Sequence, residues 1–146
     1  MIRKYREADL DVLLTIWESA STLAHPFLDS LFTEKVKVDM RKLYLPNSDT
    51  WIFEKNKTPI GFISMLGNEI GGLFVNPKNQ SKGIGTSLVN YVAQMHPVLE
   101  VEVFTKNKIG EPFYDKYGFV LTKEYFNEAA QEMVLRMKYN KLITKS

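Results

Sequence analysis

The chain has 146 residues, of which 45% are hydrophobic and 25% charged, which indicates one globular domain with a substantial core. It contains no cysteine, which excludes disulfides, thiol nucleophiles and cysteine-ligated metals. Because it has only two histidines, a zinc site is not expected. Because no apolar run has the length of a membrane span and no signal peptide is recognisable, the cytoplasm is the expected location.

The net charge of +2 comes from the end of the chain. Residues 138–146 contain Lys138, Lys141 and Lys145 and no acidic residue, and without these three the chain has 16 basic and 17 acidic residues. A nearly neutral body does not indicate a nucleic-acid-binding face. We therefore predict a single domain over residues 1–138 and a basic C-terminal tail over residues 139–146.

The first half of the chain is predicted to hold one strand, two helices and a hairpin. Apolar residues at helical spacing place one helix from residue 9 to about 21 and another from 29 to about 44. The residue before Pro26 is pushed away from helical geometry, which separates the two helices. The second helix should bury a stripe made of Phe32, Val36, Met40 and Leu43. The strands are expected at residues 2–5, 50–55 and 60–66, with a turn at 56–59.

The second half alternates strands with helices. A strand over residues 69–75 leads through a glycine-containing loop into a helix that ends near residue 95. Pro112 is tolerated in a first helical turn, so the next helix is expected from near Gly110 to a cap at Gly118. The remaining strands are expected at residues 98–104, 120–125 and 133–138. The order of elements indicates an α/β fold with a mixed sheet.

The most distinctive segment is the loop from Asn76 to Thr86, with the sequence NPKNQSKGIGT. Gly83 and Gly85 let a ligand approach the bare N–H groups of the first helical turn, where the helix dipole favours an anion. Lys82 adds positive charge. The loop therefore predicts a pyrophosphate cradle, and the alternative is a helix that simply begins after a glycine turn.

Two common phosphate-binding motifs do not fit this loop. The P-loop requires Lys followed by Ser or Thr directly after its last glycine, and Thr86 stands there instead. The dinucleotide-binding motif requires a third glycine three residues after Gly85, and that residue is Leu88. Binding of a free nucleotide is therefore disfavoured.

A different family does fit. Gln80-x-x-Gly83-x-Gly85, after a strand that ends in Val-x-Pro, resembles the acyl-CoA pyrophosphate loop of the GNAT superfamily of N-acyltransferases. Asn107, followed by Phe-Tyr-x-x-x-Gly-Phe over residues 113–119, is similar to the C-terminal motif of that family. The resemblance covers nearly the whole chain. It implies the GNAT fold, a sheet of about seven strands with about four helices, with the fourth and fifth strands splayed around the acyl-CoA.

The resemblance also implies which residues bind the cofactor. The backbone at the end of the fourth strand would bind the pantetheine arm and polarise the thioester carbonyl. The loop would wrap the pyrophosphate, braced by Gln80. Asn107 would contact the pantetheine, although an Asn after a strand is also a common turn residue. The predicted set is Leu73, Phe74, Val75, Ser81, Lys82, Gly83, Ile84, Gly85, Thr86 and Asn107.

Three residues are candidates for the catalytic acid and base. Tyr114 is the predicted general acid, because the resemblance places this phenol near the departing CoA thiolate, and a buried core aromatic is the alternative. Glu102 on the fifth strand is one candidate base for the amine. Glu69 at the start of the fourth strand is the other, acting through a water. Strand alternation puts Glu102 on the face of Glu100, so an ordinary surface charge is the alternative reading.

The acceptor side is inferred from the family arrangement, in which the first two helices wall the acceptor cleft. The candidates are Trp17, His25, Phe27 and Trp51. His25 would bind the acceptor or relay a proton, and a structural role is the alternative. Gly110 stands where the family usually has Ala. We expect it to loosen the helix start without affecting the chemistry.

These features predict an acetyl-CoA-dependent N-acetyltransferase that acts by direct attack in a ternary complex and needs no metal. The His-Pro-Phe after the first helix is similar to small bacterial acetyltransferases that act on protein lysines or N-terminal amines. A small-molecule amine acceptor is an alternative, as is a non-catalytic acyl-CoA-binding regulatory module. We expect no nucleic-acid or membrane partner, and a monomer or homodimer.

Overall fold

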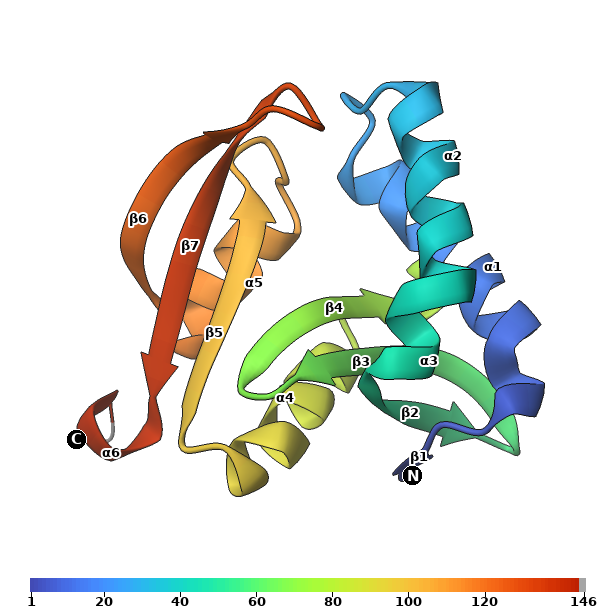
Figure 1. Ribbon diagram of the computed structural model, residues 1–146. Helices are drawn as coiled ribbons and strands as arrows, with labels where there is room; N and C mark the ends of the chain where they lie inside the picture. Colours follow the sequence, from blue (N-terminus) through green and yellow to red (C-terminus); the bar gives the residue numbers. More distant parts are fainter. Residues whose placement is uncertain (145–146) are drawn as a thin grey trace.

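The computed structural model describes residues 1–144 and contains a seven-stranded sheet in the order β1-β2-β3-β4-β5-β7-β6 (Figure 1). The β4–β5 pair is parallel and every other neighbouring pair is antiparallel. The mixed α/β sheet predicted from the sequence is therefore confirmed. The strands are β1 (Ile2–Lys4), β2 (Asp49–Lys55), β3 (Thr58–Leu66), β4 (Glu69–Val75), β5 (Val98–Phe104), β6 (Val120–Asn127) and β7 (Glu132–Asn140).

The helices lie on both faces of the sheet. On one face of the sheet, α4 and α5 pack in one buried cluster, which includes Leu88, Val101 and Met137. On the opposite face of β2–β4, α1 packs over Ile52 and Phe62 in a second cluster. The helical segments are η1 (Glu7–Asp9), α1 (Leu10–Ala24), α2 (Ser30–Asp39), η2 (Met40–Tyr44), α3 (Leu45–Asn47), η3 (Pro77–Asn79), α4 (Ile84–Met95), α5 (Gly110–Tyr117) and α6 (Lys141–Thr144).

The second helical segment differs from its prediction. It runs without a break from α2 through the π-helical turn η2 into α3, where Leu45 N–H donates to the Met40 carbonyl five residues earlier. A π turn holds more residues than an α turn, so the side chains after it are rotated. Leu45 is therefore 2% exposed, while Leu43, predicted on the buried stripe, is 53% exposed.

Several boundaries also move. Helix α1 continues to Ala24, and the β2–β3 turn consists of Asn56 and Lys57, both with positive φ, so β3 begins at Thr58. Strand β7 extends two residues past the predicted domain boundary at 138, and Lys141–Thr144 forms the short helix α6. Lys145 of the predicted basic tail lies outside the described residues. No helix within residues 1–144 has the length and apolar character to cross a membrane.

Strands β4 and β5 touch only at their beginnings. Glu69 is paired with Glu100 and Ile70 with Val101, and beyond this point the two strands diverge (Figure 1). The predicted splaying of the fourth and fifth strands is confirmed. No described strand pairs with this edge of β4 beyond Ile70, so its backbone groups are left for other partners.

Candidate active site

Two clefts open where β4 and β5 diverge. The first, which we call the aromatic cleft, has a volume of about 440 Å³ and lies between the helical wall α1–α2 and β5. The second, the glycine-loop cleft, has a volume of about 370 Å³ and lies between the loop before α4 and helix α5. Leu73, Gly110 and Tyr114 line both clefts, so two ligands could meet beside these residues.

The glycine loop is held open by its own hydrogen bonds. The Gln80 side chain donates from Nε2 to the Val75 carbonyl at 3.1 Å, so Gln80 braces the loop. Gly83 has a φ of 83°, a left-handed conformation that glycine adopts at little cost, and it caps α4. The bond from Ser87 N–H to the Gly83 carbonyl leaves the preceding N–H groups of this turn without a helical partner. The turn therefore fits an anionic group.

Seven of the ten predicted cofactor residues line the glycine-loop cleft: Leu73, Val75, Ser81, Gly83, Ile84, Gly85 and Thr86. Three do not. The Phe74 ring points to the opposite face of β4, contacts Phe62 with 5.6 Å between ring centroids, and lines the aromatic cleft. Asn107 also lines the aromatic cleft, and Lys82 is exposed outside both. Alternation along β4 explains Phe74, because the backbone and not this side chain faces the diverging edge.

The sequence did not reveal the far wall of the glycine-loop cleft. Helix α5 and the loop before it contribute Ile109, Pro112, Phe113 and Lys116. These residues lie more than 20 positions after the glycines, and nothing in their local pattern marks them as cleft residues. Lys116 is the one charged residue that lines this cleft in the described chain.

Tyr114 lies at the junction of the two clefts and is 6% exposed. Its ring contacts those of Phe113 and Phe119 edge-on, each with 5.2 Å between centroids. Burial raises the pKa of the Tyr114 hydroxyl far above its ordinary value. The phenol therefore stays protonated at neutral pH.

Both predicted carboxylates lie at the fork between β4 and β5, and both line the aromatic cleft. Arg136 on β7 binds them together, donating to Glu69 at 3.3 and 3.4 Å and to Glu102 at 3.2 Å. It also donates to Glu100 at 3.2 Å. The Tyr125 hydroxyl on β6 donates a further hydrogen bond to Glu102. We call Glu69, Glu100, Glu102, Tyr125 and Arg136 the fork network. No sequence pattern indicated that one guanidinium would bind three carboxylates.

Three of the four predicted acceptor residues lie at or beside the aromatic cleft. Trp17 and His25 line it, and Phe27 contacts the rings of His25 and Phe104 at its edge. Trp51 does not line this cleft, so its prediction as an acceptor-binding residue is corrected. Its ring lies on the other face of the sheet, 4.8 Å from that of Tyr91 on α4 and beneath the Lys4 ammonium. The sequence placed Phe32, Val36 and Met40 in a buried stripe, and in the structure they line this cleft.

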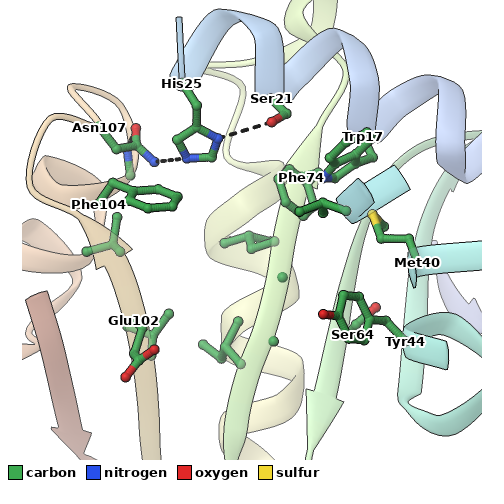
Figure 2. A pocket seen from close by; sticks show the side chains of 18 of the residues that line it. Trp17, Ser21, His25, Met40, Tyr44, Ser64, Phe74, Glu102, Phe104 and Asn107 are labelled. Atoms are coloured by element: carbon green, nitrogen blue, oxygen red, sulfur yellow. Dashed lines mark hydrogen bonds between the residues drawn. The ribbon is translucent and has the colours of Figure 1, made fainter. Parts of the chain in front are cut away.

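His25 is fixed by hydrogen bonds at both ring nitrogens (Figure 2). Its Nε2 lies 3.1 Å from Asn107 Nδ2, and its Nδ1 lies 3.1 Å from Ser21 Oγ. The Asn107 amide is oriented by its Oδ1, which accepts from two backbone N–H groups, so Nδ2 donates and Nε2 accepts. The proton is therefore on Nδ1. Burial lowers the pKa of His25 to about 4, so the ring is neutral at neutral pH.

The arrangement of His25 favours the structural alternative over acceptor binding or proton relay. Both nitrogens are already bonded within the protein, and the ring sits edge-on against Phe27 and Phe104. A relay would need one nitrogen to exchange its proton with a substrate.

A family model, a sequence relative and a solved structure all match this chain over most of its length. The chain matches the family model for the acetyltransferase (GNAT) domain over residues 18–140. It is 35% identical over 120 residues to the peptidyl-lysine N-acetyltransferase YiaC of Escherichia coli (strain K12), covering 82% of each protein. The solution structure of apo-form YjaB from Escherichia coli has a TM-score of 0.86 at 26% identity, covering 95% of this chain and 96% of that one.

A further solved structure has the same fold with a bound ligand. The PaiA N-acetyltransferase from Thermoplasma acidophilum, in complex with coenzyme A, has a TM-score of 0.79 at 19% identity. The match covers 95% of this chain and 98% of that one.

The partly buried, neutral His25 predicts how stability depends on pH. Its pKa is about 4 when folded and about 6.5 in an unfolded chain. Because the folded pKa is depressed, this contribution to stability is complete above about pH 6.5 and is lost as the pH falls towards 4. We expect the loss to be on the order of 1–3 kcal/mol, and to be absent in His25→Gln. Urea unfolding at pH 7 and pH 4.5 measures it, and equal declines in the two proteins would contradict the assignment.

Proposed function

This chain belongs to the GNAT family of acyl-CoA-dependent N-acetyltransferases, and we propose that it transfers an acetyl group from acetyl-CoA to a lysine amine of a protein. The observation that carries the proposal is the meeting of two clefts at Tyr114. One cleft is suited to an anionic donor and the other to a cationic amine, and only their junction is shared.

The glycine-loop cleft supports acetyl-CoA as the donor. The pyrophosphate would lie against the N–H groups of residues 84–86, within reach of Lys116, which lines the same cleft. The pantetheine arm would follow the edge of β4 beyond Ile70, where no described strand is paired. This path leads from the loop to Leu73 and Tyr114, so the thioester would arrive where the second cleft begins.

The aromatic cleft supports a lysine side chain as the acceptor. Its helical wall is apolar, with Trp17, Val36 and Met40 among its lining residues, and would bury a four-carbon stem. The charged residues lining it are Glu69 and Glu102, which would attract the ammonium at the end of that stem. Relatives named peptidyl-lysine N-acetyltransferases provide independent support for this class of acceptor.

The proposed reaction is direct transfer in a ternary complex. Glu102, or Glu69 through a water, would accept a proton from the ammonium, so that the free amine can attack the thioester carbon. As the C–N bond forms and the C–S bond breaks, Tyr114 would donate its proton to the departing sulfur. The chain has no cysteine that could carry the acetyl group as a thioester, and both clefts open on Tyr114 together.

The acceptor can be tested by measuring CoA thiol release from acetyl-CoA with three amines. We expect turnover with peptides containing an internal lysine and an acetylated N-terminus. Peptides that contain only a free N-terminus, and spermidine as a small-molecule amine, should react at least about tenfold more slowly in kcat/KM. Preference for spermidine would favour a small-molecule acceptor. Binding of acetyl-CoA without thiol release on any amine would favour a non-catalytic module.

Tyr114→Phe tests the general acid. Removing the hydroxyl should lower kcat by about 100-fold, a typical contribution of a positioned acid, because the thiolate must then leave unprotonated. The Kd for acetyl-CoA should stay within about twofold, since the ring that packs in the junction remains. Tyr117→Phe is the matched control, because its hydroxyl binds Asn90 on α4 and lines neither cleft. Unchanged turnover in Tyr114→Phe would overturn the role.

Glu102→Gln and Glu69→Gln test the base, with Glu100→Gln as the control. All three carboxylates bind Arg136, but Glu100 does not line the aromatic cleft. The variant that removes the base should lower kcat/KM at least about tenfold, while Glu100→Gln should stay close to wild type. Equal losses in all three would show that the fork network matters only as a structural unit.

A further inference from the structure

The two walls of the aromatic cleft are joined by a short chain of hydrogen bonds at its upper end (Figure 2). Ser21 and His25 belong to the end of α1, and Asn107 belongs to the loop between β5 and α5. The Nε2–Nδ2 contact of 3.1 Å connects residues that are 82 positions apart. We call Ser21, His25 and Asn107 the histidine bridge.

We propose that His25 is a positioning residue that orients Asn107 and, through it, the first turn of the helix that carries Tyr114. The inference rests on the proposed role of Tyr114 as the acid. It assigns His25 neither a contact with the acceptor nor a place in proton transfer.

The connection from His25 to Tyr114 is short and passes through one side chain. Asn107 Oδ1 accepts from Ile109 N–H at 3.0 Å and from Gly110 N–H at 2.7 Å, which caps α5. The Asn107 carbonyl also accepts from Glu111 N–H at 3.3 Å. Because α5 has only eight residues, its first turn is half of the helix, and Tyr114 lies one turn after Gly110. The orientation of the Asn107 amide therefore fixes the turn from which Tyr114 projects.

Gly110 also helps to place the Asn107 side chain. A Cβ atom at Gly110 would lie 2.6 Å from Asn107 Nδ2, closer than real contacts allow, and 3.1 Å from Val103 Cγ2, a tight contact. An alanine there would displace the amide from its bond to His25. The proposal therefore departs from the expectation that this glycine leaves the chemistry untouched, since its lack of a side chain lets Asn107 reach both α5 and His25.

The surroundings of His25 keep the bridge in one arrangement. The ring is edge-on to Phe27, with 5.8 Å between centroids, and to Phe104, with 5.1 Å. Asn107 is 7% exposed and Ser21 is 5% exposed. The nearby cation, Lys106, lies with its Nζ 5.9 Å from the centre of the Phe27 ring. The partners of both ring nitrogens are therefore shielded from water, and the bridge is suited to hold the walls at a fixed separation.

Two substitutions of His25 separate its two hydrogen bonds. In His25→Gln the side-chain oxygen can stand near the position of Nε2 and accept from Asn107, whereas in His25→Asn the shorter amide can reach only Ser21. We expect His25→Gln to keep kcat within about threefold of wild type, and His25→Asn to lower kcat at least about tenfold, as misplacement of a catalytic group does. The KM for acetyl-CoA should change less than about twofold in both. His96→Asn, at the end of α4, is the matched control and should leave kcat unchanged.

Gly110→Ala provides an independent route to the same defect. It should lower kcat as His25→Asn does. The double variant His25→Asn/Gly110→Ala should be no slower than the slower of the two single variants, because both substitutions break the same contact between His25 and Asn107. Loss of activity in His25→Gln equal to that in His25→Asn would overturn the proposal, as would additive effects of His25→Asn and Gly110→Ala.

Nitrogen-15 NMR of the imidazole in the wild-type protein tests the histidine bridge without any activity assay. The proposal requires a neutral ring protonated on Nδ1, with Nε2 as the acceptor, at pH 7. A ring protonated on Nε2 would overturn it even if the enzyme is fully active. If the Nδ1–H form is found but no amine is acetylated, the proposed function fails and the bridge between the walls stands.

Discussion

The site depends on one constraint, the early separation of β4 from β5. Two residue pairs join these strands, Glu69 with Glu100 and Ile70 with Val101, and the sheet then divides. A continuous sheet would use every backbone group on the facing edges for its own hydrogen bonds. Because β4 loses its neighbour, the edge can serve a ligand, and the gap above it becomes two clefts that share Leu73, Gly110 and Tyr114.

A gap in a sheet must be held open at a fixed width, and polar contacts do so at both of its ends. The fork network lies at the closed end, where Arg136 links carboxylates from β4 and β5. The histidine bridge lies at the open end and links α1 to the loop before α5. Apolar packing holds each wall, with one cluster under α4 and α5 and another under α1. The relative position of the walls therefore rests on a few directional bonds.

The features that the sequence predicted well are local ones. The bounds of β4 and β5, the glycine loop and the start of α5 follow from strand propensity, glycine placement and Pro112, each of which acts within a few residues. The predictions fail where segments distant in the sequence come into contact, or where one extra residue in a helical turn changes which side chains are buried. The π turn displaced Leu43 in favour of Leu45, alternation turned Trp51 away from the cleft, and the contact between His25 and Asn107 spans 82 residues. Arg136 gave no local signal because its three partners come from two other strands.

The charges of the two clefts have opposite signs, and this has a kinetic consequence. The charged side chains that line the aromatic cleft in the described chain are Glu69 and Glu102, whereas Lys116 and the first turn of α4 face the glycine-loop cleft. In the proposed reaction, a polyanionic donor and a cationic acceptor would therefore feel opposite fields as they diffuse towards the same junction. Under the proposed function each substrate would be repelled from the entrance of the other, so misdirected encounters would be suppressed before any specific contact forms. Added salt should weaken this electrostatic sorting, since it screens exposed charges over about 8–10 Å at physiological ionic strength.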